Sequence, residues 1–205
     1  MTPASHHPQT AGPRRKQTDD IKLPRARTLK TAFNFARAIG APLNRWVTIH
    51  WAGAPSHIDP FDRLALFLDR YKAWAYRRAF APAWTYVRER QLSRVEHAHL
   101  AVHVPPDDGE AFDLAARGWV ERDAIEPMTP ETIMIKPIRI GTDYRVAMYM
   151  LKGGNAAVRK TYDLVGRPTQ GRIDGKRTGV SHNIGATAQL DAGWHTGATG
   201  NLTRH

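Results

Sequence analysis

Hydrophobic and polar residues alternate along two neighbouring segments in the middle of the chain. Residues 84–90 are rich in aromatic and β-branched side chains, and residues 97–104 place histidines at alternate positions among alanine, leucine and valine. A period of two is typical of half-buried β-strands, whose successive side chains point to opposite faces. Since only a short segment around Ser93 separates the two strands, we expect them to form an antiparallel hairpin.

This hairpin predicts a cluster of three polar side chains. Pairing around Ser93 places Glu89 opposite His97, with His99 two residues further along the same face. Cross-strand neighbours on one face have Cβ atoms about 5 Å apart, so the three side chains should converge. Two imidazoles and a carboxylate form a suitable site for a divalent metal ion. Glu96 is close in sequence, but strand parity puts it on the opposite face and excludes it.

A second ligand set stays open at this point. His103 lies on the same face of the predicted strand as His97 and His99. The three histidines without Glu89 are therefore the alternative set of metal ligands.

Similar patterns predict the other elements. Residues 45–51 alternate as a strand, and residues 132–140 read as a strand whose Pro137 indicates a sheet edge or a bulge. Apolar residues at helical spacing predict helices over residues 28–39, from Asp59-Pro60 to Pro82, over 110–117 and over 143–152. The order strand, helix, hairpin, helix, strand, helix predicts an α+β fold, a split βαβ ferredoxin-like sandwich. We expect an antiparallel sheet with helices mainly on one face.

The net charge of +11 is concentrated at the two ends of the sequence. Residues 1–30 hold seven Lys and Arg against two acidic residues, and residues 153–205 hold seven against three, whereas residues 31–152 hold sixteen against fourteen. Basic ends of this kind are typical of nucleic-acid binding, with a solubilising role as the alternative.

These features divide the chain into three parts. We expect a disordered basic arm over residues 1–28, a folded domain over 29–154 and a partly ordered, basic, Gly-rich tail over 155–205. The candidate nucleic-acid-binding residues lie in the two flanking parts: Arg14, Arg15, Lys16, Lys22, Arg25, Arg27, Arg159, Lys160, Arg172, Lys176 and Arg177.

Several function classes are excluded by the sequence. The chain has no cysteine, which removes disulfides and thiolate metal sites and fits a reducing compartment. We find no apolar run of the roughly 20 residues that a membrane helix needs and no apolar signal core, so we expect a cytoplasmic protein. The phosphate-binding pattern GxxxxGK[ST] is also absent, so no ATPase motor is encoded in this sequence.

Three local patterns, taken in order, resemble the HUH endonucleases. They are RWVTIHW at residues 45–51, HAH at 97–99 with the acidic Glu89 on the preceding strand, and YMLK at 149–152. The HAH triplet resembles the two histidines around a hydrophobic residue that give the family its name. The YMLK stretch resembles the YxxK motif of its single-tyrosine, rolling-circle replication-initiator branch. The resemblance covers residues 43–154 and leaves both flanks unexplained.

The resemblance implies a metal-dependent nickase and strand transferase. Tyr149 would attack a phosphodiester of single-stranded or hairpin DNA, leaving a 5′-phosphotyrosine and a free 3′-hydroxyl, and Lys152, on the same helix face, would assist it. Glu89, His97 and His99 would hold a divalent metal, with Mn²⁺ or Mg²⁺ the expected ions.

The biological role that the resemblance implies is the start of rolling-circle replication of a plasmid or phage. Host helicase and polymerase would then be partners, since the sequence has no motor of its own. A relaxase or transposase of the same family is the close alternative. A non-catalytic nucleic-acid-binding domain on the same fold is the alternative from another class.

Overall fold

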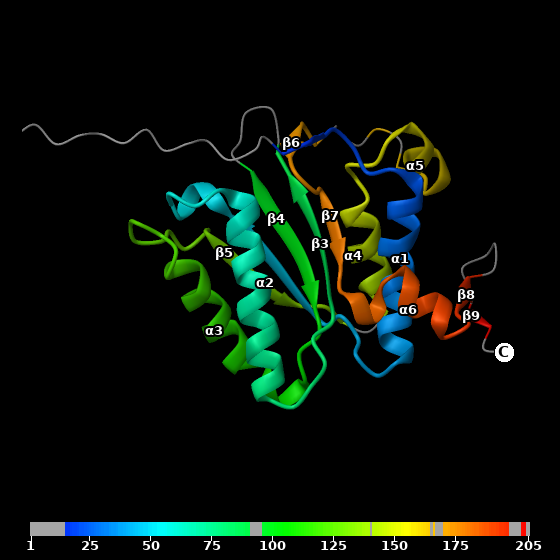
Figure 1. The fold of residues 1–205 in the computed structure, drawn as a ribbon, viewed down its shortest axis with the longest axis horizontal. Helices are drawn as coiled ribbons and strands as arrows, with labels where there is room; N and C mark the ends of the chain where they lie inside the picture. Colours follow the sequence, from blue (N-terminus) through cyan, green and yellow to red (C-terminus); the bar gives the residue numbers. More distant parts are fainter. Residues whose placement is uncertain are drawn as a thin grey trace, which may run out of the picture.

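The computed structural model of the protein describes residues 15–90, 96–139, 141–164, 166, 170–196 and 202–203. Its centre is an antiparallel sheet of five strands in the order β5-β2-β4-β3-β7 (Figure 1). The strands are β2 (Arg45–His50), β3 (Trp84–Glu89), β4 (His97–Val102), β5 (Ile133–Pro137) and β7 (Thr178–Val180). The predicted α+β class with an antiparallel sheet is therefore confirmed, and β5, which contains Pro137, is an edge strand as predicted.

Four of these strands form the predicted split βαβ arrangement. Helix α2 (Pro60–Arg77) connects β2 to β3, and helix α3 (Gly109–Glu121) connects β4 to β5. In both cases the two connected strands run parallel with one antiparallel strand between them. Two interleaved units of this kind make up a ferredoxin-like sandwich.

Local sequence explains why α2 begins where it does. The Asp59 side chain accepts a hydrogen bond from the backbone N–H of Phe61 at 2.8 Å, and Pro60 occupies the first helical position. Apolar residues along one side of α2 then pack with α3 on one face of the sheet. The buried core on this face includes Val47, Ile49, Leu64, Phe67, Tyr71, Trp74, Leu100 and Phe112.

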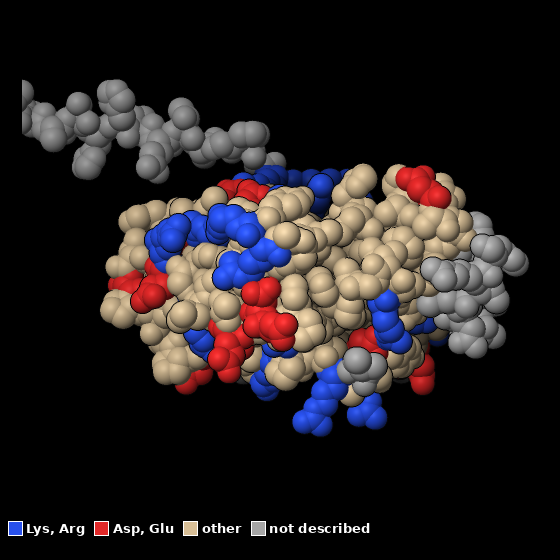
Figure 2. Space-filling model, turned by 90° about the horizontal axis from the view of Figure 1, so that it is seen from below, with Lys and Arg blue, Asp and Glu red and all other residues tan. Residues whose placement is uncertain are grey.

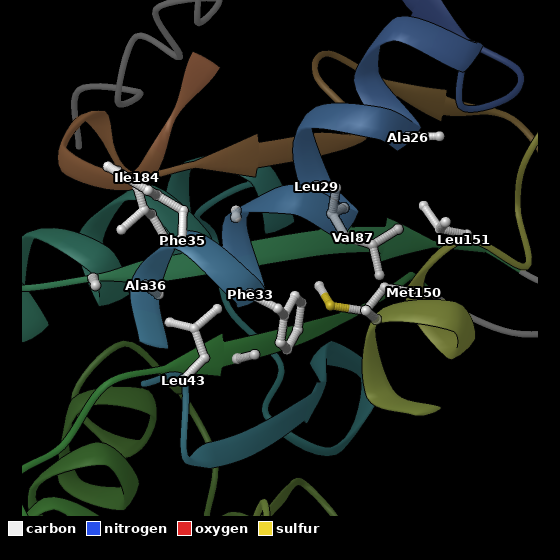
Figure 3. Close-up of a cluster of buried hydrophobic side chains, with 14 of the residues drawn as sticks. Ala26, Leu29, Phe33, Phe35, Ala36, Leu43, Val87, Met150, Leu151 and Ile184 are labelled. Carbon is white, nitrogen blue, oxygen red and sulfur yellow. The ribbon is translucent and has the colours of Figure 1, made fainter. Parts of the chain in front are cut away.

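The opposite face of the sheet carries a second helical layer. Helices α1 (Leu23–Ala38) and α4 (Asp143–Met150) lie on the side away from α2 and α3 (Figure 1). Their apolar side chains, such as Leu29 and Met150, pack with Val87 of β3 (Figure 3). The expectation that helices cover mainly one face is correct for the ferredoxin-like unit alone and wrong for the whole molecule.

The expected disordered arm is wrong for residues 15–28. Helix α1 begins at Leu23, five residues before the predicted start, and Ile21 and Ala26 are buried. Upstream of the helix, β1 (Gln17–Thr18) pairs with β6 (Ile173–Asp174). Pro24 is one reason for the error: it lies in the first turn of α1, where the missing backbone N–H is not needed.

The expected tail after residue 154 is also largely folded. Strand β7 pairs with β3. Helix α5 (Ala156–Thr161) precedes this strand in the sequence, and helix α6 (Ala186–Asp191) follows it. The remaining elements are short: 3₁₀ turns at Trp51–Gly53, Pro106–Asp108 and His182–Ile184, and the pair β8 (His195–Thr196) and β9 (Leu202–Thr203). Among the described residues, no helix has the length and apolarity required to cross a membrane.

If the second layer is an integral part of the fold, truncating a buried side chain in α1 should destabilise the whole protein. Leu29 is fully buried, so Leu29→Ala should lower the free energy of unfolding by about 2–5 kcal/mol. Leu114→Ala is the matched control, because Leu114 is also helical but 77% exposed, and it should change stability by less than about 0.5 kcal/mol. Urea unfolding followed by circular dichroism measures both. Equal stability of the two variants would contradict this assignment.

Candidate metal centre

The β3–β4 hairpin has the predicted register. Glu89 lies opposite His97, and Val87 lies opposite His99. The ligand atoms of Glu89, His97 and His99 all lie within 4.8 Å of one another, and all three residues are buried. The Nε2 atoms of His97 and His99 are 3.2 Å and 3.4 Å from the same carboxylate oxygen, Glu89 Oε2. Glu96 is on the other face, where its carboxylate pairs with Arg88, as strand parity predicts.

Residues of β2 position the two imidazoles from the neighbouring strand. Thr48 Oγ1 lies 2.9 Å from His99 Nδ1, and the Trp46 ring stacks on the His99 ring at 5.0 Å between centroids. His50 pairs with His97 in the sheet and stacks on its ring at 5.3 Å. These contacts follow from the alternation of β2, which turns Trp46, Thr48 and His50 towards the same face.

The donor atoms fit a divalent metal ion. Glu89 Oε1 and His99 Nε2 are buried and make no hydrogen bond with the described residues. Leaving such polar atoms unsatisfied costs about 1–3 kcal/mol each, and a metal ion bound to them would remove that cost. The contact of Thr48 with His99 Nδ1 suits this role, because a metal-binding histidine commonly hydrogen-bonds through its other ring nitrogen.

The charges around Glu89 keep it ionised in spite of burial. Burial alone raises the pKa of Glu89, but the adjacent His97 and His99 imidazoles and the positive charge of Lys152 outweigh it and hold that pKa well below the ordinary range. For His99, burial lowers the pKa more than the neighbouring Glu89 raises it, which favours the neutral imidazole. An ionised carboxylate and a neutral imidazole are the forms that bind metal ions.

Lys152 connects this cluster to Tyr149. The Lys152 Nζ atom lies 2.7 Å from Glu89 Oε2 and donates a hydrogen bond of 2.6 Å to the Tyr149 hydroxyl. Since Nζ lies 2.6 Å from one oxygen and 2.7 Å from the other, the two oxygens are at most about 5.3 Å apart. The predicted helix of residues 143–152 is present as α4, followed by a turn that contains Lys152.

Tyr149 lies beside the histidines and is 42% exposed. Its ring makes edge-on contacts with the rings of His99, at 5.2 Å, and Trp46, at 5.7 Å. The Lys152 ammonium lies between the Tyr149 hydroxyl and Glu89. Any group that enters between Tyr149 and Glu89 must therefore displace the Lys152 ammonium or bind to it.

The alternative prediction, in which His103 replaces Glu89 as a ligand, is wrong. Its Nδ1 donates a hydrogen bond of 2.9 Å to the carbonyl oxygen of Pro42, and its ring contacts Phe80. His103 is four residues beyond His99, and a strand rises about 3.3 Å per residue, so His103 lies roughly 13 Å further along the sheet. Three histidines on one face of a strand therefore do not reach one ion.

The predicted nucleic-acid-binding residues do not form one group. Arg177 is buried and donates hydrogen bonds to the carbonyl oxygens of Arg88, Thr18 and Gly171, so its role is structural and the prediction for it is wrong. Arg15 pairs with Asp59 and Asp62, and Arg159 is partly buried. Exposed side chains are Lys16, Lys22, Arg25, Arg27, Lys160, Arg172 and Lys176, while Arg14 lies outside the described residues.

Two of the exposed cations also have acidic partners. Lys22 pairs with Asp20, and Arg172 pairs with Asp19. On the face shown in Figure 2, basic and acidic side chains are interspersed. The exposed cations remain candidates for phosphate contacts, but that face presents no continuous basic surface.

Sequence reasoning gave no site role to three residues that border the cluster or Tyr149. Trp46 and Thr48 contact His99, and Arg145 lies one helical turn before Tyr149 and lines pockets next to it. The signals for them were present in the sequence: the strand parity of residues 45–51, and the spacing of four between Arg145 and Tyr149, which places both on one helix face.

Comparisons with protein-family models, with curated proteins and with solved structures found no match. The arguments about function therefore depend on the site itself.

The two pKa shifts predict how stability depends on pH in the presence of a chelator. Both pKa values are lower in the folded protein, so unfolding takes up protons below about pH 6.5 at His99 and below about pH 4.5 at Glu89. The free energy of unfolding should therefore decrease as the pH is lowered from 7 to 4, with at most about 1.4 kcal/mol per pH unit from one group.

Urea unfolding in EDTA at several pH values tests this dependence. His99→Gln should flatten the profile between pH 7 and pH 5, where the imidazole titrates. His57→Gln should keep the profile of the parent protein, because His57 is exposed and outside the cluster. An unchanged slope in His99→Gln would show that His99 is not held neutral by the fold.

Proposed function

We propose that this protein is a metal-dependent single-strand DNA endonuclease and ligase that forms a covalent 5′-phosphotyrosine link. The observation that carries the proposal is the Lys152 ammonium, which contacts both the Tyr149 hydroxyl and the Glu89 carboxylate beside His97 and His99. A half-exposed tyrosine next to a buried set of metal-binding side chains is a suitable arrangement for attack on a phosphodiester.

The residues of this chain have separate roles in the proposed reaction. The Tyr149 oxygen forms a bond to phosphorus while the bond from phosphorus to the 3′-oxygen breaks, and the departing 3′-oxygen takes up a proton. The phenolic proton passes to solvent, which in turn supplies the proton taken up by the 3′-oxygen, and the Lys152 ammonium, which already donates to the Tyr149 oxygen, stabilises the negative charge. Reversal of the same steps rejoins the strand, because the covalent link conserves the phosphodiester.

Glu89, His97 and His99 would hold the divalent metal ion. When bound, such an ion neutralises a phosphate oxygen and helps to orient the phosphorus for attack. A site of two imidazoles and one carboxylate accepts Mn²⁺ more readily than Mg²⁺, because imidazole is a poor ligand for Mg²⁺. Thr48 would fix the orientation of His99 through its Nδ1 contact.

We further propose that the reaction starts rolling-circle replication of a plasmid or phage. Replication initiators, relaxases and transposases can use the same cleavage chemistry. The sequence YMLK at residues 149–152 is the observation that favours an initiator, since its tyrosine and lysine are the two residues in hydrogen-bond contact. Unwinding of the template would then depend on a host helicase and its extension on a host polymerase.

Metal binding can be tested without activity. Mn²⁺ at a hundred times its dissociation constant should stabilise the protein by about 2.7 kcal/mol, which corresponds to a rise of roughly 5–10 °C in the thermal midpoint. His99→Gln and Glu89→Gln should remove this rise, while His57→Gln should retain it. If all variants respond to Mn²⁺ equally, the ion binds somewhere other than this cluster.

The nucleophile can be tested with labelled single strands from the DNA next to the gene. With Mn²⁺, the parent protein should give a covalent adduct that migrates as a slower band on a denaturing gel. Tyr149→Phe should abolish the adduct, since the attacking oxygen is gone, and should leave DNA affinity within about twofold because one hydroxyl is removed.

Two further tyrosines provide controls for this experiment. Tyr144→Phe alters the same helix at an exposed position, and Tyr162→Phe alters a tyrosine outside the cluster; both variants should still form the adduct. An adduct that persists in Tyr149→Phe and disappears in Tyr144→Phe would move the nucleophile to Tyr144. Binding of DNA without an adduct for any variant or divalent metal would support a non-catalytic binding domain instead.

A further inference from the structure

The surface next to Tyr149 contains a pocket that the proposed reaction does not use. Its volume is about 320 Å³, and it lies between β2, β5 and the beginning of α4. Pro137, Ile138 and Val146 provide apolar walls, and the indole of Trp46 provides an aromatic one. This volume is at the lower end of the range for small-molecule sites, about 300–1,000 Å³, and suits one nucleotide better than a longer segment.

We propose that this pocket binds the base of a nucleotide adjacent to the phosphate that Tyr149 attacks, and that Trp46 is its main contact. The inference depends on the proposed function, because it assigns a specific part of the DNA substrate to the same site. An aromatic ring beside apolar walls is the usual platform for an unpaired base, which stacks regardless of its identity.

The position of the pocket favours this occupant. Tyr149 forms part of its wall, and the rings of Trp46 and Tyr149 are in contact at 5.7 Å. A base in the pocket would therefore lie next to the Tyr149 side chain, and its own phosphate would extend towards Lys152 and the metal ligands. The other ring contact of Trp46, with His99, joins the pocket to the metal centre.

Charge at the rim supports a nucleotide over an uncharged apolar ligand. Lys136 and Arg145 both line the pocket and are exposed, and neither has an acidic partner within the described part of the chain. Arginine and lysine with free donors are the usual partners of phosphate oxygens. Both cations lie in the central segment, away from the two basic ends of the sequence.

A second pocket that also borders Tyr149 suggests the path of the bound DNA strand. It has a volume of about 290 Å³ and is lined by Tyr144, Met148, Lys152 and Leu164 in addition to Tyr149 and Arg145. Arg145 and Tyr149 therefore border both pockets. A single strand that crosses Tyr149 would place one nucleotide on each side of the attacked phosphate, with Arg145 close to the backbone between them.

The Trp46 pocket can be tested with a series of intact oligonucleotides of a sequence that the parent protein cleaves. Each oligonucleotide lacks the base at one different position. Binding is measured by fluorescence anisotropy in full-length Tyr149→Phe protein, which prevents the reaction. At one nucleotide flanking the cleavage position, loss of the base should weaken binding about five- to a hundredfold. Adding Trp46→Ala should weaken binding of the intact strand by a similar factor and make the abasic site at that position harmless.

Two variants separate this effect from general damage. Tyr76→Ala removes an aromatic that is 67% exposed and outside the site, and it should leave the abasic profile unchanged. Arg145→Gln should weaken binding at every abasic position alike and reduce the slope of log affinity against log salt by about 0.7. The rise in thermal midpoint with Mn²⁺, measured on Trp46→Ala, shows separately whether His99 and the other metal ligands stay in place without the indole.

The outcomes distinguish this inference from the proposed function. If the parent protein forms the tyrosine adduct but Trp46→Ala keeps the parent abasic profile, the pocket assignment is wrong and the nickase proposal is unaffected. If Arg145→Gln leaves the salt slope unchanged, Arg145 does not contact the DNA backbone as proposed. If no strand gives an adduct, the proposed function fails, and the assignment of the pocket fails with it.

Discussion

The contact between Lys152 and Glu89 is the interaction on which the arrangement of the site depends. The Glu89 side chain is fully buried, and an ionised carboxylate in such a position requires positive charge nearby. The hairpin supplies two imidazoles, but the ammonium group comes from the turn after α4, more than fifty residues further along the chain. This requirement for charge compensation holds the end of α4 against the sheet and thereby places Tyr149 beside the histidines.

The burial of Glu89 depends in turn on the second helical layer. In the ferredoxin-like unit alone, α2 and α3 cover one face of the sheet (Figure 1). The metal ligands lie on the other face, because they share strand parity with Val87, which packs in the second cluster. Helix α1 covers that second face, where Leu29 and Phe33 pack near Val87 and Met150 (Figure 3). Residues without any role in chemistry thus create the low-dielectric surroundings in which the carboxylate and imidazoles interact strongly.

The sequence alone predicts the hairpin and its register, but it does not predict the elements that surround the hairpin. Strand parity determines which residues share a face, so the register of Glu89 and His97 could be derived from alternation. Parity does not limit distance along a strand, which is why His103 was considered a ligand. The burial of Arg177 and the pairing of β7 depend on contacts between segments far apart in the chain, and a short strand rich in Gly and Thr has little periodicity to reveal it.

The pairing of β7 with β3 has a consequence for how the protein is made. Until residue 180 has left the ribosome, β3 would be the border of the sheet, with unpaired backbone groups next to the metal ligands. The ferredoxin-like unit is complete some forty residues earlier, at Pro137. During synthesis, the nascent chain therefore passes through a stage in which an open β-strand can pair with another copy, and the emergence of β7 ends that exposure.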